Sequence, residues 1–192
     1  MKKHYITAEQ LLSDSIQLAL NVLDSGFEPD LIVGIWRGGA PVGIAVQEIF
    51  EFLGVETDHI SIRTASYSTK EIDKQVDEVR VYGLAYLEEN YTGDHGVLLV
   101  DDVFDSGRSL NTVINRLKEI FGQDLPDYKI ATPYYKPSRN NTNLVPDYYI
   151  HATSDWLVFP HELVGLSHEE LLTQKPGIDA VRERLANVKK PR

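Results

Sequence analysis

Cysteine is absent from the 192 residues of this chain, which excludes disulfides, thiolate catalysis and cysteine-ligated metals. Basic residues are also scarce: 19 Lys and Arg stand against 29 Asp and Glu, for a formal net charge of −10 at pH 7. A general nucleic-acid-binding protein carries a basic face. The basic cluster here is the tail Lys189-Lys190-Pro191-Arg192, which we interpret as a solvated end. We therefore expect no nucleic-acid partner.

Long apolar runs are missing too. No stretch approaches the roughly 20 apolar residues of a membrane-spanning helix. The lysines Lys2 and Lys3 are not followed by the apolar run of a signal peptide. We expect a soluble, cytoplasmic protein with no membrane partner. The hydrophobic content of 42% suffices for one sizeable core, and one domain is the default at this length.

Apolar segments of two periodicities alternate along the chain. Short runs such as 31–35 and 97–100 have the length and β-branched content of buried strands, and segments with helical spacing follow them. The alternation predicts an α/β fold, with a mostly parallel, twisted sheet flanked by helices. A later strand is predicted over 128–136, where Pro133 argues for an edge position or a strand end.

The most informative stretch runs from Val97 to Phe121, VLLVDDVFDSGRSLNTVINRLKEIF. A buried strand ends at the acidic pair Asp101-Asp102, and a polar loop then leads into an amphipathic helix. Ligands of open α/β sheets lie outside the carboxyl ends of the strands, and N–H groups at a helix start attract anions, usually phosphate. The loop consists of Asp105, Ser106, Gly107, Arg108 and Ser109. It predicts a phosphate site.

The acidic residues of this stretch have more than one interpretation. Asp101 and Asp102 are suited to ligate Mg²⁺, which takes one or two carboxylates together with substrate oxygens, or to hydrogen-bond the vicinal hydroxyls of a ribose. Asp105 either supports the turn or acts as a general base, and the two roles are compatible.

A second loop follows strand 31–35. Gly38 and Gly39 would let the backbone approach a ligand closely, and Arg37 offers a bidentate fork to phosphate. The alternative is an ordinary strand-to-helix turn with a surface arginine. Beyond it, the polar segment 64–79 lacks a clear apolar face. Such a segment is either a lid or binding loop, or a disordered surface loop.

Residues 97–109 resemble the phosphoribosyl-pyrophosphate (PRPP) signature of the type I phosphoribosyltransferases. The shared pattern is four apolar residues, two acids, two further residues, then Asp-Ser-Gly with a hydroxyl residue nearby. Arg108 departs from it, because a small residue is frequent at that position. Residues 31–39 resemble the pyrophosphate loop of the same family.

Three further segments resemble the branch of the family that acts on 6-oxopurines. Ser66-Tyr67 is similar to the start of the catalytic lid, and Lys136 to the lysine that faces the purine O6. Trp156 matches the aromatic that stacks on the base, and the backbone carbonyl of Leu157 would face the purine 2-position. His161 and Glu162 receive no role. The whole resemblance spans about residues 30–162.

The resemblance implies a type I phosphoribosyltransferase fold with a small hood. We expect a single domain over 1–192, with a core over about 28–135, a mobile lid over about 64–80 and a base-binding hood over about 136–165. It also implies transfer of the phosphoribosyl group from PRPP to xanthine, guanine or hypoxanthine, with release of pyrophosphate. A homodimer or homotetramer is expected.

The resemblance also implies a role for each site residue. Arg37, Gly38 and Gly39 would stabilise the leaving pyrophosphate together with Mg²⁺, with Arg37 as a catalytic group. Asp101 and Asp102 would hold the ribose hydroxyls directly or through Mg²⁺. Residues 105–109 would surround the 5′-phosphate, with Arg108 either adding charge to the phosphate site or pointing to solvent, and Asp105 would accept the N7 proton of the purine.

Three alternatives stay open. One is a nucleotide-sensing regulator that keeps the PRPP-binding fold without catalysis, although the acidic composition lacks the basic face such a protein would use on nucleic acid. Another is a phosphoribosyltransferase for a different base. The third is an unrelated sugar-phosphate or phospho-acceptor α/β domain, which would leave Arg37, Lys136 and Trp156 unexplained.

Overall fold

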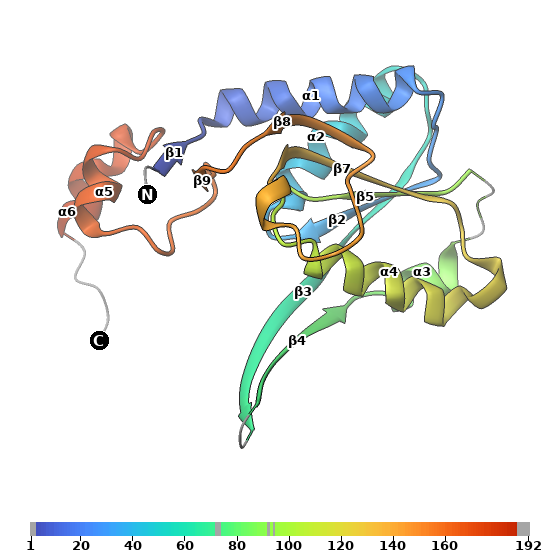
Figure 1. Cartoon of the computed structure of the whole chain (residues 1–192). Helices are drawn as coiled ribbons and strands as arrows, with labels where there is room; N and C mark the ends of the chain where they lie inside the picture. Colours follow the sequence, from blue (N-terminus) through green and yellow to red (C-terminus); the bar gives the residue numbers. More distant parts are fainter. Residues whose placement is uncertain (1–2, 72–73, 92, 94, 188–192) are drawn as a thin grey trace. The chain divides into compact units, whose positions relative to one another are not determined.

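Figure 1 shows the computed structural model, which describes residues 3–71, 74–91, 93 and 95–187. The chain forms two compact units. Unit 2 spans Asp14–Ser154, and unit 1 combines Met1–Ser13 with Asp155–Arg192. The predicted hood of about 136–165 is therefore divided between the two units, and the division into core, lid and hood remains a prediction.

A mostly parallel sheet forms the centre of unit 2, which confirms the predicted fold class. Its strands lie in the order β4-β3-β2-β5-β7-β6, and β8 also pairs with β7. Every pairing is parallel except that between β3 and β4. The strands are β2 (Leu31–Trp36), β3 (Asp58–Glu71), β4 (Lys74–Tyr82), β5 (Val97–Val100), β6 (Val103–Phe104), β7 (Tyr128–Tyr135) and β8 (Tyr148–Ala152).

Helices cover both faces of this sheet, with α1 and α2 on one face and α3 and α4 on the other (Figure 1). They are α1 (Ala8–Asp24), α2 (Gly39–Phe52), α3 (Ala85–Asn90) and α4 (Arg108–Phe121). All four residues of β5 are 0% exposed, as expected for a parallel strand buried on both sides. Alternate residues of β2 and β5 form one core cluster with the apolar face of α4. The apolar runs and helical spacings in the sequence therefore reflect a real two-sided core.

The expectation for Pro133 was wrong. β7 is an interior strand, with β5 and β6 along one side and β8 along the other. Its pairing with β5 ends at Ala131, its pairing with β6 begins at Tyr134, and the register with β8 passes from Thr132 to Tyr134. Pro133 lies in this gap between ladders, a position that suits a residue without an N–H to donate.

The described residues of the polar segment 64–79 belong to a regular two-stranded ribbon. β3 and β4 pair antiparallel from Arg63↔Tyr82 to Glu71↔Lys74. Figure 1 shows this ribbon extending away from the sheet of unit 2. It is built as paired strands and not as an irregular surface loop; its role as a lid remains a prediction.

Unit 1 joins the two ends of the described chain. Its strands β1 (Lys3–Tyr5) and β9 (Trp156–Val158) pair in parallel, and the N–H of Ile6 continues the ladder to the carbonyl of Val158 at 3.0 Å. The short helices α5 (His168–Thr173) and α6 (Arg182–Asn187) follow. The 3₁₀ turns of the chain are η1 (Gly122–Asp124), η2 (Pro137–Arg139) and η3 (Asp179–Val181). No helix in the described part of the chain is long and apolar enough to cross a membrane.

Candidate active site

The two predicted anion loops meet at one edge of the sheet. β2 and β5 are neighbouring parallel strands, so their carboxyl ends lie side by side. A Cβ atom added at Gly38 would lie 2.2 Å from the carboxylate of Asp102, and one added at Gly39 would lie 2.2 Å from the carbonyl oxygen of Val100. Both glycines are therefore needed for the loop after β2 to pack against the acidic pair.

The acidic pair is closely packed at the end of β5. Asp102 is 7% exposed. The N–H of Asp102 donates to Oδ1 of Asp101 at 3.0 Å, and the N–H of Gly39 also donates to the Asp101 carboxylate. Burial, followed by the charge of Asp102, raises the pKa of Asp101 well above its ordinary value, and the two N–H groups oppose this rise. Two such carboxylates favour a cationic or hydroxyl-bearing ligand.

The donor set at this edge fits Mg²⁺ bound together with a substrate. Mg²⁺ takes one or two protein carboxylates and completes its shell with substrate oxygens and waters, and Asp101 and Asp102 supply such a pair. Within the ranges that the structure describes, no group of three or more His, Asp or Glu residues gathers as a metal site.

A small polar pocket lies beside the acidic pair, where the loop after β6 enters α4. It has a volume of about 70 Å³ and is lined by Asp101, Val103, Phe104, Asp105, Ser106, Gly107, Ser109 and Leu110. The first turn of a helix has backbone N–H groups without intrahelical partners, and here that turn borders the pocket. The pocket is therefore suited to an anion such as a phosphate.

Gly107 shapes the turn that forms this pocket. It adopts φ +75°, a left-handed conformation that other residues rarely take, and a Cβ there would lie 2.7 Å from the ring of Phe104. Arg108 begins α4 with an exposed side chain and is not among the residues that line the pocket. Its predicted contact with phosphate remains a prediction.

Asp105 is held between two cations. The Lys136 ammonium lies 3.0 Å from Oδ2 and donates a hydrogen bond to it, and Nε of Arg139 lies 2.6 Å from Oδ1 without hydrogen-bond geometry. The Lys136 side chain is 8% exposed, whereas that of Asp105 is 34% exposed. The structure thus brings together Asp105 and Lys136, the two residues that the sequence analysis assigned to the purine, and it adds Arg139 beside them.

Arg139 is a site residue that the sequence analysis did not predict. It lies at the end of the 3₁₀ turn η2, which bends the chain back after β7, and its N–H donates to the carbonyl of Lys136 at 3.0 Å. The signal was present in Lys136-Pro137-Ser138-Arg139, because a proline after a strand followed by a second cation indicates a tight turn that carries both charges.

The remaining predicted residues lie on other parts of the chain. Arg37 is exposed, and its carbonyl accepts the N–H of Ala40 at 3.2 Å in the turn before α2. Ser66 and Tyr67 lie in β3, opposite Val79 and Glu78 of β4. Their roles in binding pyrophosphate and closing the site remain predictions.

Trp156 and Leu157 belong to β9 of unit 1, whereas Asp105 and Lys136 belong to unit 2. The Trp156 side chain is half-exposed and Leu157 is buried. The predicted convergence of Trp156 with Lys136 over the Asp105 loop therefore remains a prediction.

The chain matches the phosphoribosyl transferase domain family over residues 4–163. It is 33% identical over 158 residues to a xanthine-guanine phosphoribosyltransferase of Desulfotalea psychrophila, covering 81% of this chain and 83% of that protein. It is 27% identical over 169 residues to a xanthine-guanine phosphoribosyltransferase of Cereibacter sphaeroides, covering 84% and 88%. The crystal structure of a purine phosphoribosyltransferase from Pyrococcus horikoshii matches with a TM-score of 0.64 and 29% identity, covering 87% and 99%.

The family match extends over the strands that carry the acidic pair, the glycine loop and the anion pocket. These three features meet at one sheet edge of unit 2, where α/β enzymes bind their ligands. The chain therefore belongs to the phosphoribosyltransferase family.

Proposed function

We propose that this protein transfers the 5-phosphoribosyl group from PRPP to a 6-oxopurine: xanthine, guanine or hypoxanthine. The products are pyrophosphate and the nucleoside 5′-monophosphate, so the reaction is one of purine salvage. The observation that supports this most strongly is the packing of Gly38 and Gly39 against the Asp101-Asp102 pair, with an anion pocket lined in part by Asp101. Two anion-binding loops around two carboxylates match a sugar that carries a phosphate at one end and a pyrophosphate at the other.

The chain's own residues hold PRPP in this proposal. Arg37 and the backbone of Gly38 and Gly39 bind the pyrophosphate and stabilise the charge that it gains as it leaves. The loop 105–109 binds the 5′-phosphate through N–H and hydroxyl groups. Asp101 and Asp102 bind the ribose hydroxyls, and their negative charge favours the oxocarbenium-like transition state. Mg²⁺, when bound at these carboxylates with PRPP, supplies positive charge to the pyrophosphate.

The ion pair between Lys136 and Asp105 suggests how the base is received. Each group has a predicted partner on the purine: the O6 carbonyl for Lys136 and the N7 proton for Asp105. In the structure the two bind each other at 3.0 Å. Purine binding would exchange this one contact for two, so that the ammonium moves to O6 and the freed carboxylate accepts the proton. Adenine has no acceptor at position 6 and gains less.

The remaining parts of the proposal concern closure and context. Trp156 would stack on the base, the carbonyl of Leu157 would face position 2, and the β3–β4 ribbon with Ser66 and Tyr67 would exclude water from the reacting carbon. A cytoplasmic location and a homodimer or homotetramer belong to the proposal as well. A regulator without catalysis is the main alternative.

Incubation of the protein with PRPP, Mg²⁺ and a panel of bases tests this function. We expect pyrophosphate and a mononucleotide with xanthine, guanine or hypoxanthine, and much less product with adenine, orotate or uracil. The absence of product with every purine would overturn the proposal. Binding of PRPP or a nucleotide without turnover would favour the regulator, and product with another base alone would identify a different transferase.

A further inference from the structure

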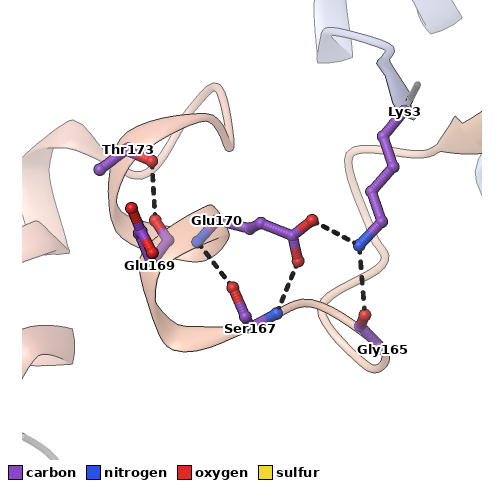
Figure 2. Close-up of polar contacts among 6 residues, drawn as sticks. All are labelled: Lys3, Gly165, Ser167, Glu169, Glu170 and Thr173. Atoms are coloured by element: carbon purple, nitrogen blue, oxygen red, sulfur yellow. Dashed lines mark hydrogen bonds and ion pairs between the residues drawn. The ribbon is translucent and has the colours of Figure 1, made fainter. Parts of the chain in front are cut away.

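Lys3 joins three segments of unit 1 at one point. Its ammonium lies 2.7 Å from Oε1 of Glu170 and 3.4 Å from the carbonyl oxygen of Gly165. Figure 2 shows both contacts as dashed lines. The same ammonium lies over the ring of Trp156, 5.9 Å from its centroid. The Lys3 side chain is 21% exposed and that of Glu170 is 26% exposed, so both are partly shielded from water.

The backbone supports the same arrangement. In the parallel pairing of β1 with β9, Lys3 is the register partner of Trp156, and His4 is the partner of Leu157. Register partners in neighbouring strands point to the same side of the sheet, which is why the Lys3 side chain reaches the Trp156 ring. Strand β1 thus supports β9, the strand that carries the predicted base contacts Trp156 and Leu157.

Glu170 is itself held in place. It forms a capping box with Ser167: the N–H of Ser167 donates to Oε2 of Glu170 at 2.8 Å, and the N–H of Glu170 donates to Oγ of Ser167 at 3.1 Å (Figure 2). One carboxylate oxygen caps α5 and the other binds Lys3. The hydrogen bond from Lys3, followed by that from Ser167, lowers the pKa of Glu170, so the carboxylate stays ionised and available to Lys3.

We propose that Lys3 is a positioning residue that fixes the Trp156 ring for purine stacking, by placing a cation on one ring face and leaving the other to the base. This role of Lys3 rests on the proposed function, because the stacking of a purine on Trp156 is part of that function. A cation over an indole ring is attracted to its electron-rich face. The ammonium is itself fixed by Glu170 and Gly165, so the Trp156 ring is restrained before the base binds. The base then loses less binding free energy to the ordering of this side chain.

Steady-state kinetics of Lys3 variants test the proposal. Lys3→Met should raise KM for the purine about three-fold, the size expected when a weakly exposed cation–π contact and its ion pair are lost. KM for PRPP should stay unchanged, because the PRPP groups belong to unit 2. Lys3→Arg should restore the wild-type value, since a guanidinium also stacks on indole.

Two glutamates in the first turn of α5 provide a matched pair. Glu170→Gln removes the ion pair with Lys3 but keeps a side chain able to form the capping box. Glu169→Gln makes the same change of charge one residue away, where only the backbone carbonyl makes a described contact, with Thr173 (Figure 2). We expect Glu170→Gln to raise the purine KM and Glu169→Gln to leave it unchanged.

A double-mutant cycle and a fluorescence measurement test whether Lys3 affects purine binding through the Trp156 ring. In a Trp156→Ala background, Lys3→Met should produce no further rise in purine KM. Independently of turnover, acrylamide should quench Trp156 fluorescence more in Lys3→Met than in wild type, with Trp156→Phe used to subtract the signal of Trp36. Unchanged quenching and purine KM would overturn the proposal, as would equal rises in both KM values. A lowered purine KM would show that Lys3 occupies the base's own face.

These experiments can distinguish failure of the proposed function from failure of the proposed role of Lys3. If the wild-type protein makes no nucleotide from any purine, the proposed function is wrong, while the quenching of Trp156 in Lys3→Met, Glu170→Gln and Glu169→Gln still decides whether Lys3 restrains the ring. If the wild type is active and the three variants behave alike, the function stands and the role of Lys3 is wrong.

Discussion

Asp105 occupies a position that a turn residue alone does not need. A carboxylate that only supported the loop would bind backbone N–H groups, whereas Asp105 lies against the ammonium of Lys136 and the guanidinium of Arg139. At 34% exposure it is also open to a ligand. Its surroundings therefore suit a group that exchanges partners during a reaction, as a general base does.

Replacing Asp105 with Asn should lower kcat far more than it changes PRPP binding. A positioned general base contributes about 100-fold or more to turnover, and an amide cannot take up the proton. The Asn side chain keeps the size of the original, so the phosphate loop should retain its shape. Initial rates at varied PRPP and varied purine measure both effects. Equal losses in kcat and in PRPP affinity would contradict the role as base.

Replacing Lys136 with Met should weaken the preference for 6-oxopurines. Loss of a charged donor to O6 should raise the purine KM about ten-fold, since such hydrogen bonds contribute about 1.5–3 kcal/mol. Lys129→Met is a matched control, because Lys129 lies on β7, the strand that leads to Lys136, and pairs with Asp147 at 3.5 Å where both side chains are about one-third exposed. The ratio of kcat/KM for hypoxanthine to that for adenine is the measurement. A ratio that changes equally in both variants would place O6 recognition elsewhere.

Single residues were predictable from sequence where local spacing determined their place. Asp101, Asp102 and Gly107 follow a buried strand and precede a helix, so their position at the sheet edge followed from the chain order alone. The contact between Lys136 and Asp105 joins residues 31 positions apart. It depends on the pairing of β6 with β7, which no local pattern encodes. A substrate partner could therefore be predicted for each residue, but their contact with each other could not.

At the scale of elements, the start of α2 links both anion loops. Gly39 is the first residue of this helix and packs against the backbone of Val100, while a Cβ added at Gly43, one turn later, would lie an ordinary 3.7 Å from the Cα of Gly34. The two glycines of one helix thus differ in purpose. Gly39 sets the distance between the loop and the acidic pair, and Gly43 is only a helical glycine near another strand.

Gly39→Ala should therefore impair PRPP binding and lower stability, while Gly43→Ala should do neither. The new methyl group at position 39 meets backbone atoms that cannot rotate away, and such overpacking costs about 1–3 kcal/mol, or a melting temperature about 5 °C lower. Alanine at position 43 should raise the melting temperature by about 2 °C, because glycine is a poor helix former. Thermal unfolding and KM for PRPP measure both. If Gly39→Ala bound PRPP normally, the two loops would not share one ligand.

The elements themselves were partly predictable. Strands buried on both faces and helices with one apolar stripe were visible in the spacing of apolar residues. The β3–β4 ribbon was not, because its polar composition gives no buried face, and its backbone pairing alone defines it. The interior place of Pro133 was also hidden, since it depends on two short ladders ending and beginning at the same point of β7.

At the scale of the whole molecule, the residues predicted to bind PRPP all lie in unit 2, whereas those predicted to bind the purine come from both units. The glycine loop, the acidic pair and the anion pocket lie in unit 2, and the predicted stacking residue Trp156 lies in unit 1. Unit 1 could not be predicted as a unit, because it pairs two three-residue strands, β1 and β9, from opposite ends of the chain. No turn signal links them, and only the long-range pairing reveals that the N-terminus supports Trp156.

The units also differ in the size of their cores. Among the described residues, six buried apolar side chains belong to unit 1: Ile6, Leu11, Leu157, Val158, Phe159 and Ile178. Unit 2 holds the remaining core, including all of β5. Regions with few buried apolar contacts open at lower free energy than the global core. We therefore expect amides of β1 and β9 to exchange hydrogen for deuterium faster than those of β2 and β5.

Ligands should slow this exchange in separate places. PRPP with Mg²⁺ should protect the amides of 101–109 and 37–39, because its phosphates and ribose bind there, and should leave 156–158 nearly unchanged. Hypoxanthine with pyrophosphate, a pair that cannot react, should protect 156–158 as the base stacks on Trp156. Adenine is the matched control and should protect this segment less, because it lacks the O6 acceptor. Equal protection of 156–158 by PRPP alone would mean that β9 responds to the sugar phosphate rather than to the base, and the assignment of Trp156 to the purine would be wrong.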